Sequence, residues 1–420
     1  MVIQNIIVQN KVRTVKKTKK VGKVIQAILL IVVILALTFS CNNGGTDKNK
    51  TGKDTLNDSS KSSKKHKDIP KGERKFNDLA RFIAGMSPEK GSAYEDQSNT
   101  EVWKKYAVSF DTSWTTLLSS KIDRMAAWGS KEVGTQKEVG GKVFYPFSGP
   151  DFVHMYTFFP TAKEYTMIGL ENVGTVQELS KMRNDSLTRY LRAVENSLNS
   201  ILNFSFFRTN SMSVDFKSQD LNGTIPVMLL FMARTGNKIL DIKPVYVDSL
   251  GKVVDGAFAV WPKKGINYGV KIDFYHEGLD DYQTVYYYSI DLGDEGLTAN
   301  KGYTAYLNNM GEVKTYVKSA SYLMHYPSFS QIRSAVLKSS SLVLQDDSGV
   351  PLQYFDKEKW TVSLYGSYVR PIDLFHERFQ KDLRAAYLND SSKIKPLDFG
   401  IGYNYILGTS NLLIAKKKTK

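Results

Sequence analysis

One short segment of the chain places a carboxylate and an imidazole at a spacing that allows acid–base chemistry. The run YPFSGPDFVH, residues 145–154, contains Asp151 and His154. If a helix begins here, these two side chains lie one turn apart, opposite the apolar face of that helix. A carboxylate so placed can orient an imidazole as a base or help to hold a metal ion. The structural alternative is a helix N-cap pair, because Ser148 and Asp151 have that spacing.

A second segment contains two adjacent carboxylates. Asp346 and Asp347 follow a short apolar run, and Gly349 comes two residues later. Carboxylates at the end of a buried strand can serve as acid and base, or bind a cation. An Asp at the start and a Gly at the end of four residues are also typical of a type I turn. The candidate catalytic residues are therefore Asp151, His154, Asp346 and Asp347, each with a structural alternative.

The remaining motifs offer less chemistry. The Gly-x-Gly of residues 399–403 has no predicted helix after it, which favours a corner over a phosphate-binding loop. His376 and Glu377 lack the second histidine of a zinc motif. His325 lies between Met and Tyr, as a packed residue would, although a hydrolase could use it. The sequence predicts no cofactor and no metal site.

Helices and strands that would position these residues are interspersed, without regular βαβ spacing. Apolar periodicity predicts helices over residues 76–86, 102–128, 175–202, 225–234, 328–339 and 372–387, the third opened by a capping box of Thr175 and Glu178. Aromatic and β-branched runs predict strands over residues 239–247, 268–275, 284–292, 342–345, 361–365 and 411–415. The pattern predicts a mixed α/β (α+β) fold, with a helical N-terminal part packed on a largely antiparallel central sheet.

The beginning of the chain has a pattern of its own. Seven basic residues and no acidic residue precede Cys41, the only cysteine, and residues 27–37 form an unbroken apolar run. This run has the length of a signal-peptide core and is shorter than the roughly 20 residues of a membrane-spanning helix. The segment resembles a bacterial lipoprotein leader, in which the cysteine is acylated and becomes the new N-terminus. The alternative is a single uncleaved N-terminal membrane anchor over Val24–Phe39.

The resemblance to a lipoprotein leader implies a division of the chain. Residues 1–40 would be a signal peptide, 41–75 the lipidated cysteine and a disordered polar tether, 76–415 a single globular α/β body, and 416–420 a basic tail. The tether has almost no apolar residues, so burial cannot offset the entropy of ordering it. The resemblance implies a bacterial cell-envelope protein that acylated Cys41 anchors to membrane lipid, with the outer membrane favoured.

The net charge of the chain is +15, from 57 Lys and Arg against 42 Asp and Glu. Most of the excess lies in the leader, the tether and the four lysines of the tail, so the body is nearly neutral. A nucleic-acid-binding protein carries its basic patch on the folded domain. Nucleic acid is therefore not expected as a partner.

Two classes of function remain open. The body can be a non-catalytic binding or assembly module for an envelope protein or glycan, with aromatic residues supplying contact area. The alternative is an envelope hydrolase with a carboxylate and histidine site. The segments YPFSGPD, residues 145–151, and LQDDSG, residues 344–349, are similar to stretches in uncharacterised bacterial proteins, which implies a shared domain and no particular activity. Proximity of Asp151, His154 and Asp346 in a pocket would favour the enzyme.

Overall fold

The structure is a computed structural model that describes residues 72–134, 140–204, 221–257, 267–389 and 391–419. All of these residues belong to one compact unit, Lys65–Lys420. The leader, Cys41 and most of the tether lie outside the described residues, so the predictions about them stay predictions. Within the described ranges, no helix is both long and apolar enough to cross a membrane.

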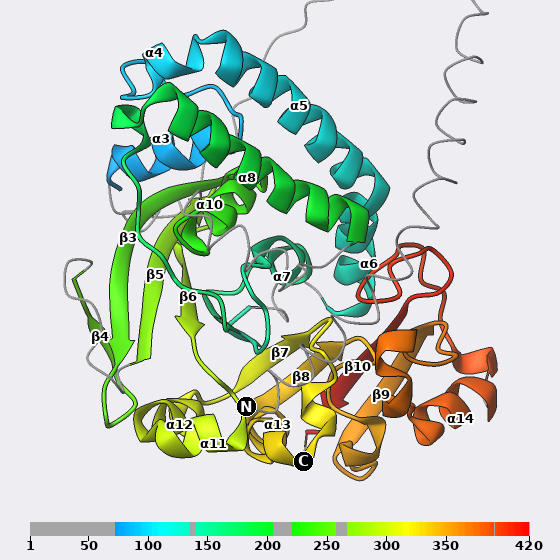
Figure 1. Ribbon diagram of the computed structural model, residues 1–420. Coiled ribbons are helices and arrows are strands. Elements are labelled where there is room, and N and C mark those ends of the chain that lie inside the picture. The colour runs from blue at the N-terminus through cyan, green and yellow to red at the C-terminus, as the bar shows by residue number, and fades with distance from the viewer. Residues whose placement is uncertain (1–71, 135–139, 205–220, 258–266, 390, 420) are drawn as a thin grey trace, which may run out of the picture. The chain divides into compact units, whose positions relative to one another are not determined.

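A mixed β-sheet forms the centre of this unit (Figure 1). Its strands are rich in Val, Ile, Leu and Tyr, residue types that fit a pleated, buried surface. In the described residues it has ten strands, in the order β4-β3-β5-β6-β2-β1-β7-β8-β10-β9. Their bounds are β1 Lys142–Tyr145, β2 Glu164–Gly169, β3 Asn237–Val247, β4 Val253–Asp255, β5 Asn267–His276, β6 Gln283–Ser289, β7 Val313–Val317, β8 Ser340–Gln345, β9 Trp360–Gly366 and β10 Asn411–Lys417.

The five central strands, β6, β2, β1, β7 and β8, run parallel to one another. The strands on both flanks pair antiparallel. The predicted mixed α/β fold is confirmed, but the antiparallel pairing expected for the sheet is limited to the flanks. Sequence patterns do not predict β1, β2 or β7, because short strands buried on both faces show no apolar–polar alternation. In β1, only the first residue is exposed.

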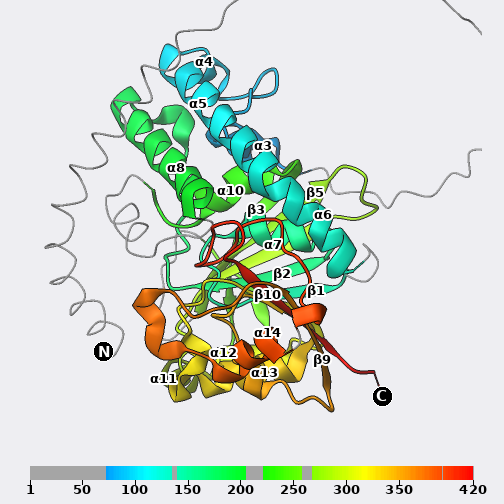
Figure 2. The same ribbon diagram turned by 90° about the vertical axis from the view of Figure 1, so that its right-hand side faces the viewer.

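Helices cover both faces of the sheet and give the unit three layers (Figures 1 and 2). In β1, Tyr145 belongs to the hydrophobic cluster on one face and its neighbour Phe144 to the cluster on the other, as the two-residue period of a strand requires. The first face carries α3 Arg74–Ile83, α5 Glu101–Leu117, α6 Asp123–Glu132, α7 Phe152–Phe158, α8 Asn184–Phe204 and α10 Ile225–Arg234. The second carries α11 Asp294–Ala299, α12 Lys301–Asn309, α13 Ser330–Ser339 and α14 Lys381–Asn389.

Several predicted elements are confirmed within a few residues. These are α3, α10, α13, β3, β5, β6, β8, β9 and β10. The helix predicted over residues 102–128 forms two α-helices, α5 and α6, joined by a π-helical turn over Leu118–Ile122. The short helix α4, Glu95–Ser98, precedes α5.

Two predicted helices begin later than expected. The capping box at Thr175 is wrong, because its hydroxyl instead accepts a hydrogen bond from the Asn222 side chain at 2.6 Å. A separate 3-10 turn buries Leu179, and α8 starts only at Asn184. The helix predicted from residue 372 is likewise replaced at first by irregular 3-10 turns over Asp373–Arg378. In the second segment none of residues 373–378 is buried, so no apolar face holds a helix against the core there.

Candidate functional site

The candidate residues lie at one edge of the sheet, where the chain leaves the parallel strands. The chain passes from β1 to β2 through α7 and from β7 to β8 through α13, in opposite directions along the sheet. The carboxyl ends of β1 and β7, which pair with each other, therefore flank a topological switch point. In open α/β sheets, ligands bind in the crevice outside such a point.

Asp151, His154 and Lys318 form a buried network at the switch point. Asp151 immediately precedes α7, His154 lies in the first turn of α7, and Lys318 directly follows β7. His154 Nδ1 lies 2.7 Å from Asp151 Oδ1, and Lys318 Nζ lies 2.8 Å from Asp151 Oδ2. Tyr145, at the end of β1, donates its hydroxyl hydrogen to Asp151 Oδ2 at 2.9 Å. None of these four residues is more than 3% exposed.

A tight turn before α7 brings Asp151 to this place. Phe147 and Gly149 have φ angles of 60° and 52°, which fold the chain back sharply after β1. The predicted N-cap pair is wrong, because Ser148 donates its hydroxyl to a backbone carbonyl and the Asp151 side chain makes no cap hydrogen bond. The Asp151 carboxylate contacts side chains instead, and its hydrogen bond from the Lys318 ammonium is charge-assisted and therefore stronger than one from a neutral N–H.

Asp151 stays ionised despite its burial. Burial by itself favours the neutral acid, but His154 and Lys318 outweigh it and hold the pKa of the Asp151 carboxyl well below its usual range. Burial also lowers the pKa of His154, against the attraction of Asp151, so the imidazole is neutral near pH 7. His154 Nδ1 also lies 3.2 Å from Lys318 Nζ, so it can donate to Asp151 in one tautomer or accept from the Lys318 ammonium in the other.

Lys318 opens a loop, residues 318–322, whose backbone is strained. The residues with positive φ are Ser319, Ser321 and Tyr322, at 51°, 51° and 53°. Side chains make this region costly, and such strain gathers at functional sites. Two other loops hold the conformation, because the Ser319 N–H donates to Asp346 at 2.9 Å and the Ser321 N–H donates to the Tyr403 hydroxyl at 3.1 Å.

Asp346 fills the inside of this loop. Its Oδ1 accepts hydrogen bonds from the N–H and the hydroxyl of Ser348, at 3.0 and 2.5 Å, while its Oδ2 accepts from Ser319. Gly402 makes room for the carboxylate, because a Cβ there would lie 2.3 Å from Asp346 Oδ2. The Gly-x-Gly segment therefore forms a corner around Asp346. The predicted turn is present too, since the Gly349 N–H donates to the Asp346 carbonyl at 3.2 Å.

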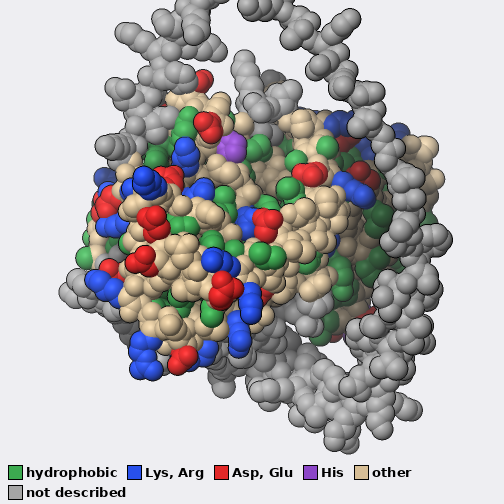
Figure 3. Space-filling model, turned by 90° about the horizontal axis from the view of Figure 1, so that it is seen from above, with side chains coloured by type: hydrophobic (Ala, Val, Ile, Leu, Met, Phe, Trp, Pro, Cys, Tyr) green, Lys and Arg blue, Asp and Glu red, His purple; other side chains and the backbone are tan. Residues whose placement is uncertain are grey.

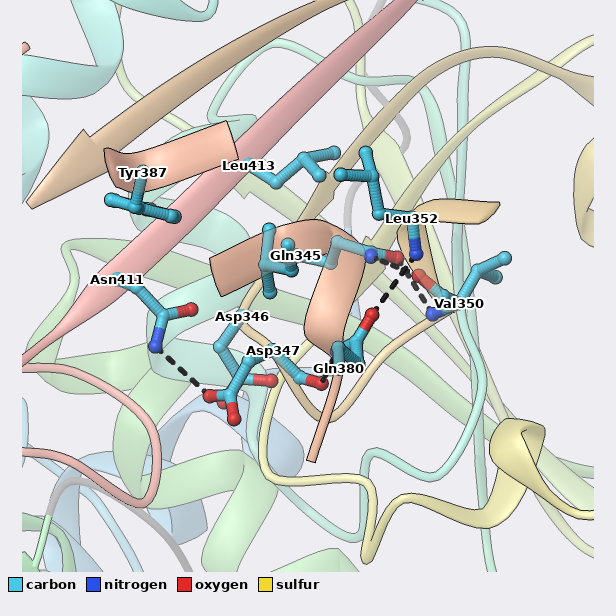
Figure 4. A pocket seen from close by; sticks show the side chains of 10 residues that line it. Gln345, Asp346, Asp347, Val350, Leu352, Gln380, Tyr387, Asn411 and Leu413 are labelled. Atoms are coloured by element: carbon cyan, nitrogen blue, oxygen red, sulfur yellow. Dashed lines mark hydrogen bonds between the residues drawn. The ribbon is translucent and has the colours of Figure 1, made fainter. Parts of the chain in front are cut away.

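Asp347, the next residue, has a different set of partners, among them Asn411 (Figure 4). It accepts hydrogen bonds from the Tyr322 hydroxyl at 2.5 Å and from the Asn411 side chain at 3.0 Å. Burial, with a further contribution from the Asp346 charge, raises the pKa of Asp347 to about 7. The cavity beside it has a volume of about 10 Å³, enough for about one water molecule.

The structure brings some of the four candidate residues together and leaves one apart. Asp151 and His154 are in direct contact, and Asp346 reaches the same network through Ser319, the neighbour of Lys318. Asp347 has separate partners. His325 packs edge-on against the Tyr322 ring at 5.1 Å, and burial lowers its pKa to about 4. Among the described residues, no three His, Cys, Asp or Glu side chains lie close enough together to hold a metal ion.

Sequence reasoning missed three residues of the site, Lys318, Tyr322 and Asn411. Lys318 and Tyr322 follow β7, which was not predicted, and Asn411 was assigned only to a strand. A lysine directly after the apolar pair of residues 316–317 is the one local signal for Lys318. It identifies a strand end only if the strand is already known.

Comparison of the chain with protein-family models, with curated proteins and with solved structures finds no match. Any function has therefore to be argued from the site itself.

Proposed function

We propose that the chain is a lipid-anchored protein of the bacterial cell envelope whose body is a non-catalytic binding module. The anchor part rests on the leader, in which seven basic residues and an apolar run precede the single Cys41. A polar tether after Cys41 would hold the body clear of the lipid headgroups. The partner would be an envelope protein or a glycan.

One observation favours a binding module over an enzyme. Each side-chain oxygen of Asp151, Asp346 and Asp347 already lies within hydrogen-bond distance of a polar group within the protein. Asp151 contacts a lysine, a histidine and a tyrosine, and Asp346 accepts from two backbone N–H groups and a hydroxyl. Asp347 accepts from a tyrosine and an asparagine. A catalytic acid or base must reach a substrate proton within hydrogen-bond distance. These groups instead stabilise the loops at the carboxyl edge of the sheet.

The stabilised loops are the expected binding surface. They include residues 401–410 and, from the loop that follows β7, the partly exposed Ser319 and Ser321. The carboxyl end of β7 flanks the switch point, outside which ligands of open α/β sheets bind. Partly exposed aromatic residues, among them Tyr403 and Tyr405, lie in the segment 401–410. On the face seen in Figure 3, acidic and basic side chains are interspersed rather than gathered by sign, which suits a protein or glycan partner.

The module can be tested with the full-length protein and purified peptidoglycan sacculi. Co-sedimentation without release of soluble sugar or peptide supports glycan binding. If sacculi are not bound, photo-crosslinking in living cells from Ser321, in the strained loop, tests the protein partner. Lack of both a sacculus complex and a discrete crosslinked partner would contradict the module.

The anchor is tested separately. Cys41→Ser should abolish incorporation of a fatty-acid analogue and release the body from membranes, because the thiol is the acylated group. Equal labelling of wild type and variant would overturn the lipoprotein assignment. A full-length, unlabelled membrane protein would favour the N-terminal anchor over Val24–Phe39.

A hydrolase is the second candidate, and one observation favours it. Asp151 holds a neutral His154 by Nδ1, the arrangement in which a carboxylate orients an imidazole as a general base. This function requires the loops to open, since both residues are buried. Release of soluble product from sacculi that disappears in His154→Gln, with the melting temperature retained, would establish the hydrolase and exclude the module.

A further inference from the structure

A cavity lies on the second face of the sheet, between the amino ends of β1 and β2 and the helix α12. Its volume is about 100 Å³, ten times that of the cavity beside Asp347. This is room for roughly seven to ten water molecules, or for one small organic molecule. All of the residues that line the cavity are described. It lies at the opposite ends of β1 and β2 from the network around Asp151.

One side of the cavity is fixed by close packing between a turn and a helix. Gly251 lies in the turn between β3 and β4, and a Cβ there would lie 2.5 Å from the backbone N of Tyr306 in α12. The φ angle of Gly251 is +78°, a conformation that also favours glycine. The turn therefore contacts the backbone of α12 directly and holds Tyr306 in place beside the cavity.

The lining of the cavity is apolar on the inside and polar toward solvent. Phe144, Met310 and Val313 belong to the hydrophobic cluster of the second face, and none of them is more than 7% exposed. Lys142 and Asn309, by contrast, are exposed, which places the mouth of the cavity beside them. A ligand in the cavity would therefore meet an apolar surface at one end and polar groups at the other.

The lining also carries no net charge. Of the described residues that line the cavity, only Lys142 and Glu164 are charged, and they are neighbours across β1 and β2. Lys142 Nζ lies 3.1 Å from Glu164 Oε1. Because each charge has a partner of opposite sign, the lining favours a neutral ligand over an ion. The amide of Asn309 offers such a ligand both hydrogen-bond donors and an acceptor.

A pair of hydroxyl groups leaves one hydrogen for a ligand. Thr166 Oγ1 and the Tyr306 hydroxyl oxygen lie 2.9 Å apart, and both residues line the cavity. Each hydroxyl has one hydrogen, and the hydrogen bond between them uses only one of the two. Within the described ranges, neither hydroxyl has another hydrogen-bond partner. Thr166 is only 4% exposed, and a buried donor without an acceptor costs free energy, so the pair favours a ligand that supplies an acceptor.

We propose that this cavity binds a single ring of a neutral sugar. A pyranose combines hydroxyl groups around its edge with apolar C–H faces, which matches a lining that is polar at the mouth and apolar inside. Its oxygens would accept the hydrogen left by Thr166 and Tyr306 and bond with the Asn309 amide. The inference goes beyond the proposed function, which places the partner on the loops at the carboxyl edge of the sheet.

The test is calorimetric titration of the full-length protein with glucose and with N-acetylglucosamine. At least one of these neutral sugars should bind. Tyr306→Phe should weaken that binding about threefold to tenfold, the usual effect of losing one neutral hydrogen bond. Glucuronate and glucosamine should bind no more tightly than the neutral sugar, because the lining has no net charge. Tighter binding of either charged sugar would contradict the proposed ligand class.

Two neighbouring asparagines of α12 provide a matched pair of variants. Asn309 lines the mouth of the cavity, whereas Asn308 is also exposed but does not line it. Asn309→Trp should fill the mouth and weaken sugar binding about tenfold or more, while Asn308→Trp should leave the affinity unchanged. Melting temperatures should show that both variants are folded, as expected for exposed positions.

No binding of either neutral sugar, or equal affinity in wild type and Asn309→Trp, would overturn the site. An equal loss in both tryptophan variants would also overturn it, because Asn308 does not line the cavity. The proposed function is judged independently, since crosslinking from Ser321 reports on the loops at the carboxyl edge of the sheet.

Discussion

Two buried carboxylates at the same edge of the sheet, Asp151 and Asp347, have opposite electrostatic environments. Asp151 contacts a cation, and its pKa is held well below the usual range. Asp347 contacts only neutral donors and follows another carboxylate, and its pKa is raised to about 7. Burial acts in the same direction on both, so partners decide the charge. The loop around Asp151 is therefore stabilised by an ion pair with Lys318. The loop around Asp347 contains a carboxyl group that gains or loses its proton near neutral pH.

The largest expected effect comes from removing the cation. Lys318→Met should destabilise the body by about 3–5 kcal/mol, because it leaves Asp151 charged and buried without its ion-pair partner. Chemical denaturation measures this loss. The double variant Asp151→Asn/Lys318→Met should lose less than Lys318→Met alone. An additive or greater loss would show that the ion pair is not what stabilises this loop.

The pH dependence of folding stability should distinguish the contribution of Asp347 from that of Asp151. Asp347 binds its proton more tightly in the folded state, so its contribution to stability is largest below about pH 4 and falls as the pH rises to about 7. Asp151 has the opposite sign, since its contribution is present above its unfolded pKa and is lost as acid protonates it. Burial raises the pKa of Asp346 as well, so Asp347→Asn should reduce the decline between about pH 4 and 7, by a few kcal/mol at most, without removing it completely. An unchanged decline in that variant would contradict the assignment.

The close packing around Asp346 predicts a smaller loss of folding stability when Gly402 is replaced. Gly402→Ala should cost about 2–3 kcal/mol, because its φ of +70° disfavours a side chain and the new Cβ would lie 2.3 Å from the Asp346 carboxylate. Gly408→Ala is the matched control, with φ of +83° and no atom within 4 Å of the added Cβ. Thermal unfolding should show the larger loss for Gly402→Ala. Equal losses would mean that backbone strain alone matters.

The smallest expected effects come from two hydroxyl groups. Tyr145→Phe and Tyr322→Phe each remove one hydrogen bond to a buried carboxylate, at a cost of about 1–2 kcal/mol near pH 7. At pH 5 the cost of Tyr322→Phe should shrink, because Asp347 is then protonated, whereas Tyr145→Phe should not change. Chemical denaturation at pH 5 and pH 7 measures both costs. If the cost of the two substitutions changed with pH in the same way, Asp151 and Asp347 would not differ in their protonation.

The sequence was informative where spacing is local. Asp151 and His154 were paired from their three-residue separation, and the two flanks of the sheet were recognised from alternating residues. Three of the five central parallel strands, β1, β2 and β7, were not, since each is short, buried on both faces and paired with distant segments. Lys318 was missed for that reason: its partner Asp151 lies 167 positions earlier, and no local pattern connects them.

The pairing of β10 between β8 and β9 has a consequence for the order of folding. Asn411, which completes the shell of Asp347, lies in β10, which follows the other described strands along the chain. Until that strand arrives, β8 has an open edge and Asp347 lacks one of its two side-chain donors. Sheets assembled from such distant segments fold slowly. The sheet should therefore close only after β10 has emerged, and truncation before residue 411 should leave an aggregation-prone, incomplete sheet.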